Sequence, residues 1–309
     1  MHKAFSAVER FLRRCARPLK QPVIRYFCRR IHIYDRAETA RRVAAGASMA
    51  RFGDGELGIA LWKYGPRFQR SDPNLKRRLC EVLQSPPDEN LLVCLPGALR
   101  TLDNLETDIA DFWRGWLFHS GTTVLPRIPR NKVYGDSFIS RLYLPYVDKS
   151  GEQAIVDGIR SAYAGKNVVL VEGQATRFGV GNDLLAGAKS VRRILCPAEN
   201  AFDRYDEIFN ACVQARGEVY LLALGPTATV LAYDLYRAGF RALDLGHMDL
   251  MYEYMARGAT KDERVARFKY DNEMAGGNVV EDCRDEAYLS QIYRRIGVPL
   301  PHGDRPAAS

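Results

Sequence analysis

Several patterns that mark common protein classes are missing from this sequence of 309 residues. The seven cysteines form no CxxC pair and the five histidines are scattered, which argues against a disulfide framework and a structural zinc site. No stretch approaches the roughly 18 apolar residues of a membrane-spanning helix. Arginines interrupt the N-terminal stretch, so we expect no secretory signal there. These absences favour a protein of the reducing cytoplasm.

Positive charge is concentrated at the N-terminus. Residues 1–36 contain ten lysines or arginines and two acidic residues, a net +8 that equals the net charge of the whole chain. The remaining residues are therefore neutral overall. Because a nucleic-acid enzyme usually carries its positive field on the folded body, we expect no nucleic-acid partner.

The same N-terminal segment has an amphipathic pattern. Apolar residues recur at helical spacing between the arginines, at Phe5, Val8, Leu12, Cys15 and Leu19. Pro18 and Pro22 are expected to break this pattern. We interpret residues 1–36 as a basic amphipathic extension ahead of a single domain at 37–309. Three roles stay open for it: salt-sensitive peripheral contact with the anionic inner face of a membrane, packing on the body of the protein, or recruitment of a partner protein.

From about residue 37 the pattern alternates between helices and apolar strands. Helices are predicted at 38–45, 57–64, 73–84, 111–118, 152–164, 183–189, 203–215 and 227–238. Strands are predicted at 48–52, 91–95, 167–171, 191–196, 219–224 and 241–245. Apolar strands joined by long crossovers predict an α/β fold with a mainly parallel sheet covered by helices on both faces.

Four polar, glycine-containing loops follow predicted strands, which is where ligands bind in such sheets. They are RFGDGE, EGQATRFGVGND, GPTATV and DLGHMDLMYEY. The first contains GDGELG, which matches the dinucleotide-binding pattern GxGxxG. That interpretation fails on electrostatics, because Asp54 and Glu56 would repel a diphosphate in the cradle unless a divalent cation lay between them. Two carboxylates plus substrate phosphates are a usual ligand set for Mg²⁺ or Mn²⁺, so we predict a metal–diphosphate site.

The second and third loops each allow two interpretations. Arg177 has the planar fork that pairs with phosphate, while Asn182 or Asp183 is placed to cap the helix expected to follow. The alternative is a plain turn with a solvated arginine. In the third loop, Gly225 permits a ligand to approach the backbone, or the Thr227 hydroxyl simply caps its own helix.

The fourth loop gathers His247, Asp249 and Glu253 directly after a strand. Asp249 and Glu253 share one face if the segment is helical, and like charges so placed repel unless a cation, a proton or a substrate hydroxyl lies nearby. This pattern is typical of a site for acid–base chemistry. The alternative is a core histidine with two solvated carboxylates.

Taken in order, these motifs resemble the GT-D-type glycosyltransferase family, first described as a domain of unknown function in bacterial surface-glycan and adhesin glycosylation loci. The matching segments cover about residues 37–255: RFGDGEL, SRLY, VEGQATRFGVGNDLL, RRILCPAENAFDRYDEI, LALGPTATVLAYDL and ALDLGHMDLMYEY. The resemblance implies one Rossmann-like domain whose DxE motif binds a divalent metal and UDP. It also implies glucosyl transfer from UDP-glucose to a growing glycan. Leu142 replaces a proline common in the family, which is expected to alter a turn but to leave Arg141 available.

We therefore predict a metal-dependent glycosyltransferase that moves a sugar from a UDP-sugar, UDP-glucose first, to a glycan or glycoprotein acceptor. Asp54 and Glu56 are the expected ligands of Mn²⁺ or Mg²⁺, which acts as a Lewis acid on the diphosphate. The base for the acceptor's proton is expected among His247, Asp249 and Glu253, with Asp249 first. The expected substrate-binding residues are Arg51, Arg141, Glu172, Arg177, Gly179, Gly181, Asn182, Gly225 and Thr227. The alternatives are a non-catalytic nucleotide-sugar-binding protein and, less favoured, a nicotinamide-dependent dehydrogenase.

Overall fold

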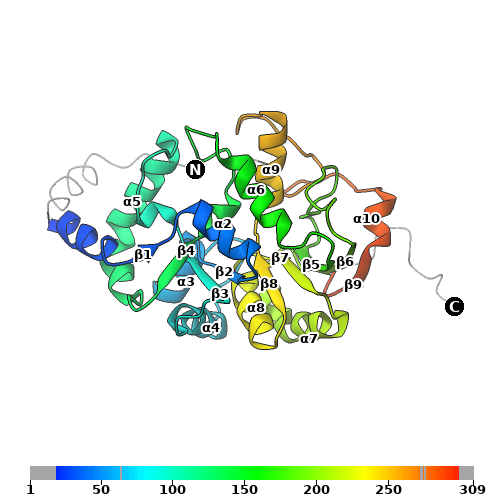
Figure 1. Cartoon of the computed structure of the whole chain (residues 1–309), viewed down its shortest axis with the longest axis horizontal. Helices are drawn as coiled ribbons and strands as arrows, with labels where there is room; N and C mark the ends of the chain where they lie inside the picture. The colour runs from blue at the N-terminus through cyan, green and yellow to red at the C-terminus, as the bar shows by residue number, and fades with distance from the viewer. Residues whose placement is uncertain (1–18, 63–64, 272–273, 275, 299–309) are drawn as a thin grey trace.

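The structure, a computed structural model, describes residues 19–62, 65–271, 274 and 276–298. Within these residues one sheet runs in the order β1-β4-β3-β2-β8-β7-β5-β6-β9, and all of its paired strands are parallel (Figure 1). The strands are β1 (His32–Ile33), β2 (Ser48–Arg51), β3 (Leu91–Leu95), β4 (Val133–Asp136), β5 (Asn167–Gly173), β6 (Ser190–Cys196), β7 (Val219–Ala223), β8 (Arg241–Asp244) and β9 (Ile292–Arg295). The predicted α/β fold with a parallel sheet is confirmed.

Helices cover both faces of this sheet, as a parallel sheet requires (Figure 1). One face packs against α3 (Asp54–Leu61), α4 (Pro73–Gln84), α5 (Thr107–Val124), α7 (Tyr205–Ala215) and α8 (Pro226–Arg237). The other face packs against α2 (Arg36–Ala44), α6 (Glu152–Ser161) and α9 (Met248–Arg257). A short helix, α10 (Glu286–Ser290), lies beside β6 through Tyr288. The short 3₁₀ helices are η1 (Gly97–Leu99), η2 (Leu125–Arg127), η3 (Ser137–Ser140) and η4 (Ala201–Arg204).

Helix starts follow the expected capping chemistry. The Asp72 side chain accepts hydrogen bonds from the amides of Asn74 and Leu75, and Pro73 occupies the first turn of α4. At α3 the cap is different, because Gly53 has no side chain and its own amide donates to the Glu56 carboxylate at 2.8 Å. One oxygen of Glu56 is thereby fixed at the start of the helix.

The centre of the sheet is the point where the two halves of the chain meet. β2 pairs with β8 through Met49 and Leu243, whereas the connections that follow these two strands lead to opposite sides of the sheet. A crevice forms beyond the carboxyl ends of strands at such a point, and ligands bind there. The fold therefore places its binding site just after Arg51 and Asp244.

Three expectations from the sequence are corrected. Residues 183–189 form turns rather than a helix, because the amides of Ala186 and Ala188 make tight turn hydrogen bonds and Lys189 bonds to Lys166 of the neighbouring strand region. Strands β1, β4 and β9 were not expected, since they are short and their residues lack a continuous apolar run. Pro22 does not end a helix; a proline ring is compatible with helical φ, and residues 19–28 are helical.

Part of the expected N-terminal extension belongs to the folded body. Residues 32–33 form the edge strand β1 against β4. In helix 19–28, Ile24, Phe27 and Cys28 are partly buried against the core. Residues 1–18 lie outside the described part of the chain, so the apolar pattern expected there stays a prediction. Among the described residues, no helix is long and apolar enough to cross a membrane.

Candidate functional site

A cavity of about 540 Å³ opens at the carboxyl ends of the central strands. Its walls come from loops that follow six strands, β2, β4, β5, β6, β7 and β8, and from helix α5. The loop between α3 and α4 and the segment between α9 and α10 also contribute. All four polar loops noted in the sequence contribute residues to it. The expected location of the site is therefore where the structure has its cavity.

The acidic pair of the first loop lies in the cavity wall. Asp54 is the first residue of α3, and Glu56 follows in the same turn. Burial raises the pKa of Glu56 to about 7, and the nearby negative charges of Asp244 and Asp54 act in the same direction. Hydrogen bonds from the amides of Gly53 and of Glu56 itself oppose this rise. A cation beside these carboxylates would relieve the repulsion between them.

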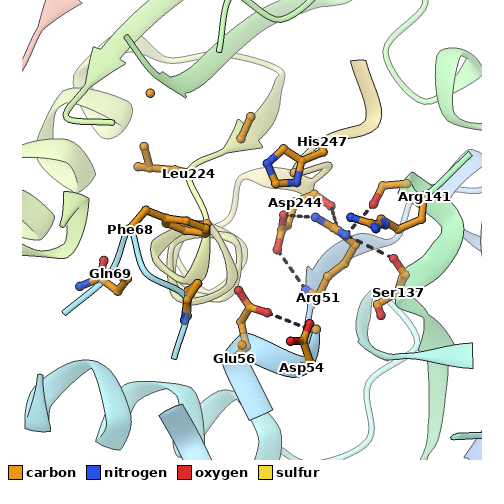
Figure 2. Close-up of a pocket in the computed structure, with 18 of the residues that line it drawn as sticks. Arg51, Asp54, Glu56, Phe68, Gln69, Ser137, Arg141, Leu224, Asp244 and His247 are labelled. Carbon is orange, nitrogen blue, oxygen red and sulfur yellow. Dashed lines mark hydrogen bonds and ion pairs between the residues drawn. The ribbon is translucent and has the colours of Figure 1, made fainter. Parts of the chain in front are cut away.

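Arg51 and Asp244 form an ion pair between the two central strands. An Arg51 Nη2–Asp244 Oδ1 distance of 2.9 Å joins them, and Arg51 Nε also donates to the Asp244 carbonyl at 2.6 Å. Arg51 Nη1 donates to the Ser140 hydroxyl and to the Ser137 carbonyl (Figure 2). Gly246 has φ +49°, and a Cβ at that position would lie 2.2 Å from Arg51 Nη2. The arginine is thus held in one position.

Carboxylates outnumber guanidinium groups among the described lining residues, with Asp54, Glu56, Asp108 and Asp244 against Arg51 and Arg141. No group of three or more His, Cys, Asp or Glu side chains in the described residues is arranged to hold a metal alone. A cation here would therefore complete its coordination with substrate oxygens. Mg²⁺ is usually bound by one or two carboxylates together with substrate phosphates, and Asp54 and Glu56 fit this arrangement.

One side of the cavity is aromatic and rich in amides. Phe68 packs over Gly225, where a Cβ would lie 2.5 Å from the ring and φ is +53°. Gln69, Asn200 and Tyr270 line the same region. Asn200 also fixes the loop that carries Phe68, because its backbone amide donates to the Phe68 carbonyl at 2.9 Å. Gly225, the residue before α8, lines the cavity, so the N-terminus of α8 lies at the cavity wall.

The opposite side is formed by α5 and by the loop after β4. Figure 2 shows Phe68 and Gln69 on one side of the acidic pair, with Ser137 and Arg141 on the other. From α5, Ile109, Phe112 and Trp113 line this second side. Asp108, at the start of α5, forms an ion pair with Lys261. The acidic pair thus stands between two differently built halves of one cavity.

The structure brings only part of the expected set into this cavity. The expected residues that line it are Arg51, Asp54, Glu56, Arg141, Gly225 and His247. Those that do not line it are Glu172, Arg177, Gly179, Gly181, Asn182, Thr227, Asp249 and Glu253. The first set surrounds the β2–β8 junction, and most of the second set lies around the loop after β5.

Asp249 and Glu253 are buried in a polar cluster beneath that loop. Lys269 is 1% exposed, and its Nζ lies 2.6 Å from Asp249 and 3.0 Å from Glu253. Asn182 donates to both carboxylates, and the Gly179 amide donates to Asp249 at 2.7 Å. The two acids do share one face of α9, as expected. Lys269 is the cation next to both acids, and Arg257 also pairs with Glu253 at 3.2 Å.

Three further expected residues lie outside the cavity, and two of them have partners within the protein. Glu172 is paired with the buried Arg193 at 2.6 Å. Arg177 donates to the carbonyls of Phe268 and Glu281. The expected cap by Thr227 is wrong, because its buried hydroxyl has no hydrogen-bond partner in the described part of the chain.

Sequence reasoning missed several residues that the cavity contains. Asp244 was visible in DLGHMD, but nothing local showed that it would pair with Arg51, 193 residues away. Phe68 and Tyr270 lie outside every polar motif, and only the fold brings them to the cavity. Ser140 belongs to the SRLY motif, but nothing in that motif indicates that its hydroxyl accepts a hydrogen bond from Arg51.

Comparisons with known proteins agree on one family. A family model described as the glycosyltransferase GT-D fold matches residues 49–274. The probable glycosyl transferase Gly of Streptococcus gordonii is 38% identical over 252 residues, which are 81% of this chain and 36% of that protein. Glycosyltransferase GlyD of Streptococcus pneumoniae serotype 4 is 34% identical over 251 residues, which are 81% of this chain and 30% of that protein. The chain thus spans about a third of these relatives' length.

Solved structures give the same result over nearly the whole fold. A selenomethionine-substituted domain of unknown function 1792 has a TM-score of 0.84 at 34% identity, covering 90% of this chain and all of that one. A new glycosyltransferase of the same domain type from Streptococcus sanguinis has a TM-score of 0.81 at 35% identity, covering 86% and 99%. Another such domain, at a TM-score of 0.80, is described as having a distinct glycosyltransferase fold. This chain is therefore a member of the glycosyltransferase GT-D fold family.

Proposed function

We propose that this chain is a metal-dependent glycosyltransferase that moves glucose from UDP-glucose onto a glycan or glycoprotein acceptor. The observation that carries the proposal is the acidic pair Asp54 and Glu56 in the cavity at the β2–β8 junction. This pair repels a diphosphate by itself, and it fits a cation that shares its ligands with one. The names of the relatives support sugar transfer as the reaction class.

Asp54 and Glu56 would hold Mn²⁺ or Mg²⁺. Such an ion neutralises the negative charge that develops on a diphosphate leaving group. Arg51 does a different task, because most of its donors are already engaged by Asp244, Ser137 and Ser140. We therefore assign Arg51 to positioning the cavity floor. Arg141 lines the cavity on the α5 side, and we assign it to direct contact with substrate.

The donor nucleotide belongs on the Phe68 side of the cavity. Gly225 places the N-terminus of α8 at the cavity, and the positive end of a helix favours a diphosphate. Phe68 and Tyr270 offer rings for stacking a base. Gln69 Oε1 and Asn200 Nδ2 offer an acceptor and a donor for its edge, because Gln69 Nε2 and Asn200 Oδ1 already bond to the backbone of Arg70. The Gly53 amide already donates to Glu56, so a nicotinamide dinucleotide would lack that donor in the cradle.

The acceptor belongs on the α5 side, beside Arg141 and Phe112. In the reaction, the acceptor oxygen forms a bond to the sugar's anomeric carbon while the bond to the diphosphate breaks, and the hydroxyl proton passes to a base. Of the three residues expected for that role, only His247 lines the cavity. We therefore propose His247 as the base, in place of Asp249.

Release of nucleoside diphosphate tests this proposal. The purified chain is incubated with UDP-glucose, other UDP-sugars and GDP-sugars, with Mn²⁺, with Mg²⁺ and with EDTA. We expect release from UDP-glucose that requires the metal and rises when a glycan acceptor is added. Tight, metal-dependent UDP binding without release from any donor would instead identify a non-catalytic nucleotide-sugar-binding protein. Release that persists unchanged in EDTA would contradict the metal assignment.

A further inference from the structure

Helix 19–28 exposes an apolar stripe that nothing in the described part of the chain covers. Leu19, Val23 and Tyr26 are 77%, 42% and 51% exposed. Their spacing of four and then three residues places them on one face of the helix. Three neighbouring exposed apolar side chains on one face differ from the isolated exposed hydrophobics that are normal on a protein surface.

The opposite face of this helix is already used for packing. Ile24, Phe27 and Cys28 are partly buried against the core, and Ile24 packs against Gly121 in α5. Lys20 Nζ donates to the Phe118 carbonyl at 3.3 Å and lies 4.8 Å from the centre of its ring. The helix is therefore fixed in rotation, and its apolar stripe points away from the body.

Arginines border the stripe. Arg25, Arg29 and Arg30 are exposed, and the Arg30 guanidinium stacks 5.1 Å from the ring of Tyr26. Two surface grooves beside the helix are lined by these arginines together with Arg100 and His32, and no acidic residue lines either groove in the described part of the chain. The sequence has no acidic residue between positions 19 and 34. The surface is thus apolar and cationic at once.

We propose that the apolar stripe of helix 19–28, together with Arg25 and with Arg29 and Arg30 just after the helix, docks on an anionic lipid bilayer. Aliphatic and tyrosine side chains enter the interfacial layer of a membrane, while guanidinium groups pair with lipid phosphates. A polyanion without an apolar layer, such as a nucleic acid, matches the arginines but leaves Leu19 and Val23 in water. The proposal is independent of glycosyl transfer, because docking needs no donor or metal.

The position of the helix has a geometric consequence for the cavity. It packs on Phe118 and Gly121 of α5, whereas Phe112 of the same helix lines the acceptor side of the cavity. At 1.5 Å per residue, Phe112 and Gly121 are roughly 14 Å apart along α5. Docking would therefore hold the cavity at a fixed distance from the lipid surface.

Vesicle co-sedimentation of the full chain tests the proposal. The vesicles contain either phosphatidylcholine alone or equal parts phosphatidylcholine and phosphatidylglycerol. We expect binding to the anionic vesicles only, weakened by salt. Replacing the stripe (Leu19→Ser, Val23→Ser, Tyr26→Ser) or the arginines (Arg25→Gln, Arg29→Gln, Arg30→Gln) should each weaken binding on the order of tenfold or more. A matched control, Val213→Ser with Arg216→Gln, alters an exposed apolar residue and an arginine near the end of α7 and should bind as the parent does.

Two results would overturn the proposal. The first is anionic-vesicle binding by the stripe variant that equals that of the parent, since it would show charge attraction alone. The second is that neither the parent nor the stripe variant binds vesicles, while the parent is a dimer and the stripe variant is a monomer. This face would then join two copies of the chain. If a triple variant loses thermal stability, the single changes Val23→Ser and Arg29→Gln give the same two readouts.

Discussion

Two acidic pairs, one at the start of α3 and one in α9, have opposite surroundings. Asp54 and Glu56 open α3 in the wall of a cavity, where burial and neighbouring negative charge raise the pKa of Glu56 to about 7. Asp249 and Glu253 lie in the first two turns of α9, where Lys269 and Asn182 contact both of them. The first pair lines a space that a substrate can enter. The second pair is satisfied by the protein itself.

The difference shows that local acid spacing does not identify a site. Both pairs follow a glycine-containing turn after a central strand, and both look equally reactive in sequence. What separates them is a lysine from a distant loop, which fills the position that a metal or substrate would take beside Asp249. A carboxylate pair is a candidate site only when the fold leaves its charge for a ligand to neutralise.

The largest effect is expected at the first pair. Asp54→Asn and Glu56→Gln should each lower UDP-glucose-dependent product formation by at least about 1000-fold, because several kcal/mol of transition-state stabilisation are lost with the cation. The melting temperature should stay close to that of the parent. Asp111→Asn, on an exposed part of α5, is the control. Activity within tenfold of the parent in both variants would remove the distinction between the two pairs.

The second pair should respond in stability. Lys269→Met leaves the buried Asp249 without a cation and leaves Glu253 with Arg257 alone, so the free energy of unfolding should fall by about 3–5 kcal/mol. Denaturant titration measures this, with the exposed Lys76→Met as the control. Adding Asp249→Asn and Glu253→Gln to Lys269→Met should recover part of the loss. A Lys269→Met variant as stable as the parent would show that the cluster does not hold α9 to its loops.

A smaller effect separates the two candidate bases. His247→Ala should reduce turnover by roughly 100-fold with little change in donor affinity, the signature of a group acting in the chemical step. Asp249→Asn should leave turnover of the folded enzyme within a few-fold of the parent, since the side chain does not line the cavity. The opposite ranking in kcat would restore Asp249 as the base.

The smallest effect is a pH dependence. The pKa of Glu56 is raised from 4.5 to about 7, so this group favours the folded state below about pH 4.5, and that contribution is lost as the pH rises through about 7. Mn²⁺ competes with the same proton, so its stabilising effect on melting temperature should be larger at about pH 8 than at about pH 6. Glu56→Gln should remove most of that difference. Equal Mn²⁺ effects at both pH values in the parent would contradict it.

Much of the fold follows from local pattern. Pro73–Gln84 and Leu91–Leu95 are found as predicted, because a capped amphipathic helix and a continuous apolar strand carry their own signals. Residues 183–189 were misassigned, because their backbone bonds partly to neighbouring segments rather than along a helix. The short edge strands β1 and β9 depend on their partners for their structure.

The site was predictable in location but only partly in membership. The loop positions followed from the rule that ligands bind beyond the carboxyl ends of parallel strands. Which side chains face the cavity depends on long-range pairs such as Arg51–Asp244 and Lys269–Asp249. No local spacing in the sequence encodes either pair. The first pair fixes Arg51 in the cavity floor, and the second ties Asp249 into a buried structural cluster.

The β2–β8 pairing also has a consequence for how the chain folds. On one side of this seam lie strands β1–β4 and on the other β5–β9, and each group closes through connections at most about half as long as the 193 residues that separate Arg51 from Asp244. Loop-closure entropy favours the shorter closures first, so the seam is expected to form late. The cavity at the β2–β8 junction would then form only late in folding. A partly folded chain would have secondary structure in both halves and no binding site.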